Sequence, residues 1–389
     1  MASSAIALER IAEPAGARSA AGEGLRLRTL APKDCSPADL HAWAQLAQDG
    51  SEPNPFFEHW YLLPALKALD KSGAARLLVL EQDGGWAGLL PIASRKSYYG
   101  KPIRHLGSWM HANCFLGAPL VARGREAAFW QALLAWADGN VEGLFLHLPQ
   151  LPLDGALFEA LRQVLAGKAR PAGIVMREER ALLQSDLSPE AYLEASMSGK
   201  KRKELRRQHN RLSETGRVEF VRDDSDAGLD QWTADFLRLE KAGWKGLNGS
   251  ALACSADTEA LFRDSLAGAA AAGRLERLTL LLDGQPIAML ANFLTAPGAF
   301  SYKTAFDEDY ARFSPGVLLQ RENLALLERA GIAWCDSCAA PDHPMIDHIW
   351  RERRAIGSVS IAIGGKLRRA AFCLILKAEL GRRPDGARL

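Results

Sequence analysis

Residues 278–293 decide the fold: they read Leu-Thr-Leu-Leu-Leu, then Asp-Gly, then Gln-Pro-Ile-Ala-Met-Leu-Ala-Asn-Phe. Two apolar runs around an Asp-Gly pair are typical of a β-hairpin, because both turn residues tolerate the positive φ of a tight two-residue turn. The same pattern occurs about 200 residues earlier, where residues 77–90 read Leu-Leu-Val-Leu-Glu-Gln, Asp-Gly-Gly and Trp-Ala-Gly-Leu-Leu. The sequence therefore predicts two similar hairpins.

The elements that follow each hairpin also come in the same order. A helical pattern at residues 129–137 leads into an apolar strand at 144–148, and a helical pattern at 317–329 leads into a strand at 332–335. A repeated order of hairpin, helix and strand predicts an α/β fold of the α+β type, with mixed sheets, in two related domains.

Length and turn-forming residues suggest the domain limits. A chain of 389 residues is longer than one hydrophobic core usually grows. The charged and Pro-containing stretch at 170–189 separates the two patterned regions. We expect domains at 25–180 and 181–365, a disordered leader at 1–24 and a basic C-terminal helix or tail at 366–389.

Composition limits the classes of function. The net charge of +2 provides no global field that would attract nucleic acid. Six cysteines are scattered along the chain, which suits a reducing compartment. No apolar run approaches the roughly 20 residues that a membrane-spanning helix needs. We expect a cytoplasmic protein without a nucleic-acid partner.

Three segments of the second half carry a family resemblance. They are the basic run at 200–212, Leu239-Glu-Lys-Ala-Gly-Trp-Lys245, and Tyr302-Lys-Thr-Ala-Phe-Asp307 followed by Ser314-Pro-Gly-Val-Leu318. From residue 200 to about 364 the chain resembles the GNAT acetyltransferase domain of the bacterial CelD (cellulose biosynthesis) type. Two such domains in tandem resemble the FemAB group. The first half would then be a degenerate GNAT-like partner, and its Asn54-Pro-Phe-Phe-Glu58 resembles the family's entry segment.

The resemblance implies that acyl-CoA is the donor, either acetyl-CoA or a longer thioester. The N-terminus of a helix offers unpaired amides and a favourable dipole to a pyrophosphate. Ser314 can cap such a helix, Pro315 suits its first position and Gly316 permits close approach. Arg312 adds positive charge, and Val317 completes the expected donor site.

Acyl transfer to an amine needs a base, because a protonated amine has no lone pair with which to attack the thioester. Asp307, at the end of a predicted strand, and Glu240 are the two candidates, and both remain open. Tyr302 could protonate the leaving thiolate. Lys303 and Lys245 could bind phosphate or an acidic acceptor, and either could instead be solvated.

An anionic group is expected at the basic helix, whose residues 200–211 include seven basic side chains and one acid. Lys201 and Arg206 are the residues of this helix that we expect to bind substrate. Trp244 is a further substrate-binding candidate. Phosphates of the donor, a phosphorylated acceptor or lipid headgroups would all fit. A solvated helix face is the alternative.

The segment at 335–348 resembles a zinc knuckle and a redox dithiol in spacing, but neither is expected there. Cys335, Cys338, His343 and His348 have ligand-like spacing, but two prolines stiffen the segment and the knuckle glycines are missing. No metal is expected. His343 or His348 could act as a base at the acceptor site, although such histidines are more often structural.

These inferences together predict an acyl-CoA-dependent N-acyltransferase that acts on an amine of a cell-envelope sugar or lipid precursor. Three alternatives remain: long-chain, ceramide-like N-acylation of a lipid amine, FemAB-like aminoacyl transfer, and a non-catalytic polysaccharide assembly factor. The acceptor would be a small molecule or lipid-linked. The basic, apolar segment at 366–377 either packs on its domain or contacts the inner membrane surface peripherally.

Overall fold

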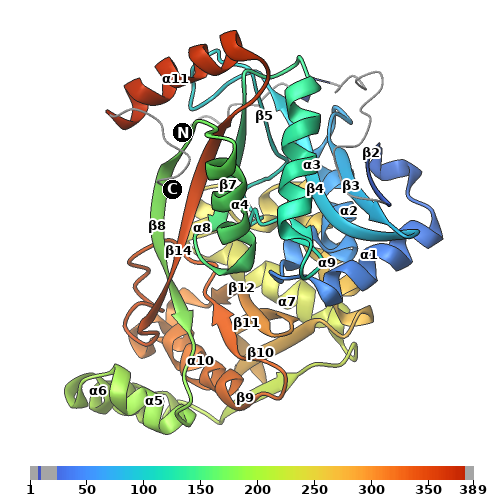
Figure 1. Ribbon diagram of the computed structural model, residues 1–389. Coiled ribbons are helices and arrows are strands. Elements are labelled where there is room, and N and C mark those ends of the chain that lie inside the picture. Colours follow the sequence, from blue (N-terminus) through green and yellow to red (C-terminus); the bar gives the residue numbers. More distant parts are fainter. Residues whose placement is uncertain (1–7, 10–23, 382–389) are drawn as a thin grey trace. The chain divides into compact units, whose positions relative to one another are not determined.

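The computed structural model describes residues 8–9 and 24–381 (Figure 1). The chain forms two compact units: unit 1 combines the residues up to Glu178 with those from Ala355 onward, and unit 2 consists of residues 179–354. The chain enters unit 2 within strand β8 (Ala172–Leu183) and leaves it within β14 (Glu352–Ala362). This division lies two residues from the expected limit at 180/181. Residues 355–365, however, were expected in the second domain and belong to unit 1.

The sheet of unit 1 contains the first hairpin. Its strand order is β2 (Leu25–Leu30), β3 (Arg76–Gln82), β4 (Gly85–Arg95), β5 (His105–Ser108), β7 (Phe145–Pro152) and β14. Neighbours are antiparallel except β5 and β7, which are parallel. Asp83 and Gly84 form the turn at φ values of 52° and 82°. The first hairpin is thereby confirmed.

Two short strands join β4 in unit 1: β1 (Leu8–Glu9) and β6 (Leu120–Val121). Apart from β1 and Gly24, the predicted leader at 1–24 lies outside the described residues.

Helices of unit 1 are α1 (Pro37–Asp49), α2 (His59–Leu69), α3 (Glu126–Gly139), α4 (Gly155–Gly167) and α11 (Lys366–Leu380). Helix α3 connects the parallel strands β5 and β7, and it lies beside α4 in Figure 1. The indole Nε1 of Trp130 donates a hydrogen bond to the Leu157 carbonyl at 2.8 Å, which ties α3 to α4. A Cβ at Gly88 would lie 2.4 Å from the Phe129 ring, so this glycine lets α3 pack closely on β4.

Unit 2 repeats this topology. Its sheet runs β9 (Val218–Asp223), β10 (Leu275–Leu282), β11 (Gln285–Thr295), β12 (Gly298–Phe306), β13 (Trp334–Asp336) and the end of β8. Only β12 and β13 are parallel, and α10 (Pro315–Asn323) stands between them in the chain, as α3 does between β5 and β7. The predicted fold class, a mixed α/β fold in two related halves, is confirmed.

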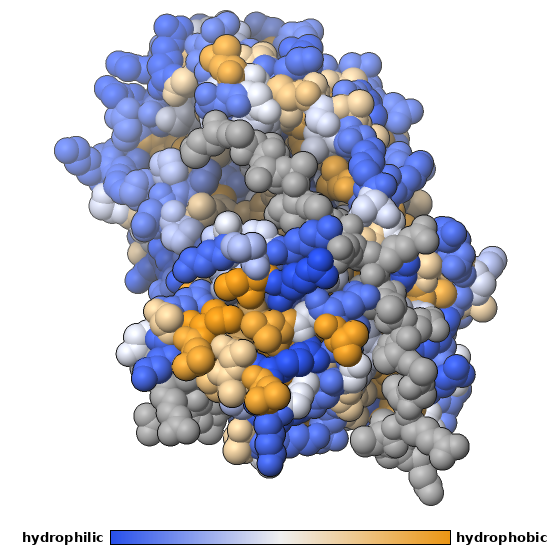
Figure 2. Space-filling view, turned by 90° about the horizontal axis from the view of Figure 1, so that it is seen from above, coloured by the Kyte–Doolittle hydropathy of each residue, from blue (hydrophilic) through white to orange (hydrophobic). Residues whose placement is uncertain are grey.

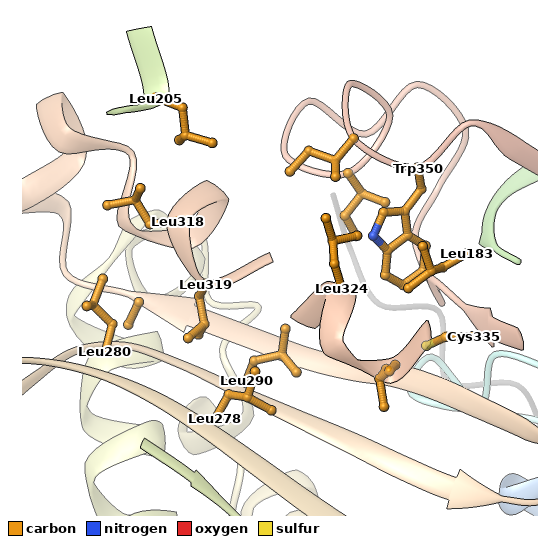
Figure 3. Close-up of a cluster of buried hydrophobic side chains, with 14 of the residues drawn as sticks. Leu183, Leu205, Leu278, Leu280, Leu290, Leu318, Leu319, Leu324, Cys335 and Trp350 are labelled. Carbon is orange, nitrogen blue, oxygen red and sulfur yellow. The ribbon is translucent and has the colours of Figure 1, made fainter. Parts of the chain in front are cut away.

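The remaining helices of unit 2 are α5 (Pro189–Ser196), α6 (Gly199–Ser213), α7 (Leu229–Ala242), α8 (Trp244–Leu247) and α9 (Ala256–Ala271). Figure 3 shows how α10 contributes to the core: Leu318 and Leu319 lie over the sheet residues Leu280 and Leu290. Trp350 lies beside Leu183 and Leu324 in the same cluster. This packing fixes the first turn of α10 against the sheet.

Helix α11 confirms the predicted C-terminal helix. Phe372 and Leu376 are buried with Tyr98 and Phe145, so the helix packs on unit 1. Leu367 and Leu374 on its outer side are 88% and 72% exposed. Figure 2, seen from above Figure 1, shows hydrophobic residues gathered in a patch on this side of the molecule. Within residues 8–9 and 24–381, no helix combines the length and the apolar character needed to cross a bilayer.

Candidate active site

The first turn of α10 contains the residues expected to hold the donor. Pro315 occupies its first position, as predicted. Ser314 stands at the N-cap, but with φ 52° its side chain caps nothing, and its carbonyl instead accepts the amides of Val317 and Leu318 at 2.9 and 3.0 Å. The expectation of a side-chain cap at Ser314 is therefore wrong. In the described part of the chain, the Gly316 amide has no backbone acceptor.

The glycine in this turn faces another part of unit 2. A Cβ at Gly316 would lie 2.6 Å from the Met345 sulfur, so the glycine admits the segment that carries Met345. Arg312 is exposed and lies over its neighbour Phe313, with 4.7 Å between the guanidinium carbon and the ring centre. Val317 is half-buried against the core of unit 2. Of the five predicted donor-site residues, Arg312 is thus the one with an accessible charge.

Tyr302 and Asp307 lie in and after β12 and have different surroundings. The Tyr302 ring is 2% exposed and stacks on Phe293 with 4.4 Å between ring centres. Asp307 begins the 3₁₀ turn Glu308–Phe313, where its Oδ1 accepts the Asp309 amide at 3.0 Å. The tyrosine is part of the core, whereas the aspartate is half-buried at the sheet edge.

Glu240 is a buried, fully engaged carboxylate. It is 4% exposed; its Oε1 lies 2.9 Å from Lys245 Nζ, and its Oε2 accepts the Leu252 amide at 2.8 Å. Trp244, next to this pair, is 52% exposed, and its amide donates to Glu308 Oε1 at 2.6 Å. The structure therefore brings Glu240 and Lys245 together, as the heptapeptide at 239–245 permits.

Lys303 belongs to the same charged group. Burial, with a further contribution from the positive charge of Lys245, lowers the pKa of Lys303 to about 8, while Glu240 acts in the opposite direction. A lysine with such a pKa exchanges its proton near neutral pH. Of the predicted site residues, the structure gathers Glu240, Lys245 and Lys303, and it places Asp307 four residues beyond Lys303.

An ionic cluster in the interior of unit 2 was not predicted. Asp336, at the end of β13, is fully buried; its two oxygens lie 3.4 Å from Arg180 Nη1 and 3.5 Å from Arg354 Nη1. Oδ1 also accepts the Cys338 amide at 2.8 Å. The sequence signal for this cluster was Asp336, an acidic residue that directly follows the apolar residues of a short predicted strand. Its partners, 156 and 18 residues away, could not be assigned from spacing.

The thiols and imidazoles of 335–348 have no metal-like arrangement. Burial raises the thiol pKa of Cys335 and Cys338 well above its usual value, so both are neutral. His343 is half-buried, with a pKa lowered by burial and by Lys245, and its Nδ1 is buried without a hydrogen-bond partner in the described structure. His348 is exposed. No group of three or more potential metal ligands occurs among residues 8–9 and 24–381.

Helix α6 presents its basic side chains to solvent. Leu205 and Leu212 are buried, whereas Lys201 and Arg206 are exposed. Arg207 pairs with Glu204 at 2.7 Å, so a part of the charge is compensated locally. The helix is amphipathic, and its exposed face is basic.

Comparisons with known proteins agree with this geometry. Residues 199–343 match the family model of the acetyltransferase (GNAT) domain. No curated protein matches the sequence. Among solved structures, FemX is similar with a TM-score of 0.54 and 11% identity, over 86% of this chain and 98% of that one.

Two further structures have similar folds. One is a conserved protein from Bacteroides thetaiotaomicron, with a TM-score of 0.52 and 12% identity over 84% of this chain and 98% of that one. The other is the C-terminal domain of a protein assigned as a lysylphosphatidylglycerol synthetase from Agrobacterium fabrum. Its TM-score is 0.50, with 14% identity over 89% of this chain and 98% of that one. At such identities the likeness concerns the fold. The family match, which covers residues 199–343, indicates a GNAT acetyltransferase domain and hence an N-acyltransferase activity.

Proposed function

We propose that the chain transfers an acyl group from a coenzyme A thioester to the amine of a small-molecule or lipid-linked acceptor, such as a cell-envelope sugar or lipid precursor. The observation that carries this proposal is the GNAT domain at 199–343, in which α10 follows β12 and precedes the parallel strand β13. In this reaction the amine nitrogen attacks the thioester carbonyl, the C–S bond breaks, and one proton leaves the amine while the thiol leaves the donor.

The first turn of α10 supports the donor assignment. The Gly316 amide lacks a backbone acceptor among the described residues, and it lies where the helix dipole favours an anion. Arg312 supplies an exposed positive charge three residues before the helix. These groups fit a pyrophosphate. Ser314 contributes its backbone conformation, because its side chain caps nothing.

The base is better assigned to Asp307 than to Glu240. Both oxygens of Glu240 already accept hydrogen bonds, one from Lys245 and one from the Leu252 amide, so an acceptor amine would have to displace one of them. Asp307 uses Oδ1 for the turn and is half-buried at the end of β12. Lys303 and Lys245 then supply positive charge for an acidic part of the acceptor.

The test is release of free thiol from acyl-CoA, measured with a panel of chain lengths and of amine acceptors. We expect Asp307→Asn to lower kcat by roughly a hundredfold, the usual contribution of a positioned base. Glu240→Gln should lower it less and should lower thermal stability, because Lys245 loses its partner. Asp226→Asn, at an exposed acid before α7, is the matched control and should change neither quantity.

Two results would remove the proposal. If no acyl-CoA of any length yields thiol while an aminoacyl donor is consumed, the reaction is aminoacyl transfer, as FemAB-like tandem domains would imply. If Asp307→Asn retains full turnover, the base lies elsewhere, and His343, with its buried and unpartnered Nδ1, is the next residue to replace.

A further inference from the structure

Unit 1 contains an open cavity of about 230 Å³, with a largely apolar lining, on the sheet face that carries His105, Gly107 and His147. We call it the unit 1 cavity. The end of β4, strand β5 and strand β7 line it, at the place where Gly107 pairs with His147 in the parallel register. Leu106 and Leu146, which alternate with these residues, are buried on the other face. The cavity is therefore built by the strands themselves, and it lies outside the GNAT match at 199–343.

One charged group of the cavity has no charged partner among the described residues. Arg95 donates to the Met110 carbonyl at 3.3 Å, and within the described structure no carboxylate lies within 4.0 Å of its guanidinium. Burial lowers the pKa of Arg95, with only the attraction of Asp70 opposing it. A half-buried cation without a carboxylate partner can be stabilised by an anion.

The two histidines can become donors to the same anion. His105 Nδ1 lies 3.3 Å from the Ile103 carbonyl, which only accepts, so Nδ1 carries the proton and Nε2 is left toward Gly107. His147 Nδ1 lies 3.0 Å from Ser360 Oγ. Burial lowers the pKa of His105 to about 4 and that of His147 to about 3. Both rings are neutral at pH 7, and Arg95 is the only fixed charge in the described lining.

A strained turn places an aromatic ring at the cavity mouth. Tyr99 adopts φ 45° and Gly100 φ 80° in a tight turn closed by two hydrogen bonds of 2.9 Å between Tyr98 and Lys101. A bulky aromatic residue at positive φ is uncommon, and such strain concentrates at functional sites. Tyr99 lines the cavity, packs edge-on against His147 and is still 63% exposed.

We propose that the unit 1 cavity binds the phosphate group of a phosphomonoester, carried by a small molecule or by a lipid headgroup. A guanidinium fork and two imidazoles offer more donors than a carboxylate can accept, whereas a phosphate presents three acceptor oxygens. Its charge of about −1.5 to −2 near pH 7 matches Arg95 together with one protonated histidine. This proposal does not depend on the acyl transfer proposed for unit 2.

Binding of phosphate should therefore be coupled to the uptake of a proton by one of the two histidines. An anion next to His105 and His147 raises their pKa values toward the neutral range, so affinity should increase as the pH falls from 8 to 6. The other charged or titratable groups around the two rings are Arg95, Tyr98, Tyr99, Lys101, Asp70 and Glu379, which accepts the Tyr98 hydroxyl. None of them has its ordinary pKa between pH 6 and 8.

Calorimetry with the full chain tests the site, with glycerol 3-phosphate and inorganic phosphate as probes and acetate as the carboxylate comparison. Arg95→Gln should weaken phosphate binding by roughly ten- to a hundredfold, the loss expected for a charge-assisted hydrogen bond. The matched control Arg123→Gln changes an exposed arginine of unit 1 and should leave binding unchanged. Equal affinity of Arg95→Gln and the natural chain, or acetate binding as tight as phosphate, would overturn the proposal.

Proton NMR of the imidazole rings gives a readout that loss of structure cannot imitate. The signals absent from His105→Gln and His147→Gln identify the two rings, and saturating phosphate should raise at least one of their pKa values by two units or more, to about 6 or above. Vesicles of phosphatidic acid, compared with phosphatidylcholine, distinguish the sources: Arg95-dependent binding to the former indicates a lipid headgroup, and binding of the soluble ester alone indicates a small molecule. Unchanged titration of both rings contradicts the site.

Discussion

At the scale of single residues, Gly316 makes the sharpest prediction about unit 2. Because a Cβ there would lie 2.6 Å from the Met345 sulfur, Gly316→Ala should destabilise the protein by about 1–3 kcal/mol, as overpacking does. The double variant Gly316→Ala with Met345→Ala should recover much of that loss. Urea unfolding checks both. Gly199→Ala is the control, since a Cβ there meets nothing within 4 Å.

If Gly316→Ala unfolds at the same urea concentration as the natural chain, Met345 does not occupy this space. The effect on stability must be known before activity is interpreted, because Gly316→Ala can reduce turnover for two separate reasons. Close approach to a nucleotide and close approach to Met345 both require the glycine. Only a variant whose stability is rescued by Met345→Ala reports on the nucleotide.

Residues also show what the sequence could and could not reveal. The Asp-Gly turns and Pro315 are local signals, since their chemistry depends on neighbours one or two positions away, and the structure confirms them. The Asp336–Arg180 contact joins residues 156 positions apart, and the unit 1 cavity gathers Arg95, His105 and His147 from three strands. Such contacts depend on the register of the sheet, which apolar patterning alone does not specify.

At the scale of an element, α11 has one packed side and one exposed side. Phe372 is 1% exposed and lies 5.2 Å from the Phe145 ring centre, so Phe372→Ala should cost about 3–5 kcal/mol of stability through the cavity that it leaves. Leu374, which is 72% exposed, provides the comparison: Leu374→Ala should change stability by less than about 0.5 kcal/mol. Thermal or urea unfolding measures both.

Equal effects of the two variants would show that α11 does not pack as described. Its sequence pattern indicated the helix and left open whether its apolar residues meet the domain or a membrane surface. The structure assigns Phe372 and Leu376 to the core of unit 1, and it leaves Leu367 and Leu374 for a surface role. Peripheral membrane contact thus remains a proposal for the outer side of one helix.

At the scale of the whole molecule, pH should affect the two units differently. His105 and His147 have folded-state pKa values of about 4 and about 3, below the value of about 6.5 that holds when the chain is unfolded. Between these limits the unfolded state binds more protons, so stability is highest above pH 6.5 and falls as the pH falls. The loss should approach 1.4 kcal/mol per pH unit for each histidine.

Urea unfolding at pH 7.5, 6 and 5, followed by hydrogen exchange in each unit, measures this effect. The exchange of amides in β5 and β7 should accelerate at low pH more than that of amides in β11 and β12. His147→Gln should flatten the pH dependence of unit 1, while the exposed His41→Gln should not alter it. A pH dependence that survives both His105→Gln and His147→Gln would assign the effect to other groups.

The return of the chain into unit 1 through β14 affects how the protein is made. Strand β7 pairs with β5 on one side and with residues 356–362 of β14 on the other, and Ser360, the partner of His147, lies on that strand. During translation the first unit thus waits for residues 356–362, which are synthesised only after the whole of residues 179–354. A premature stop codon shortly before position 355 would release a polypeptide whose open β7 edge is a template for aggregation.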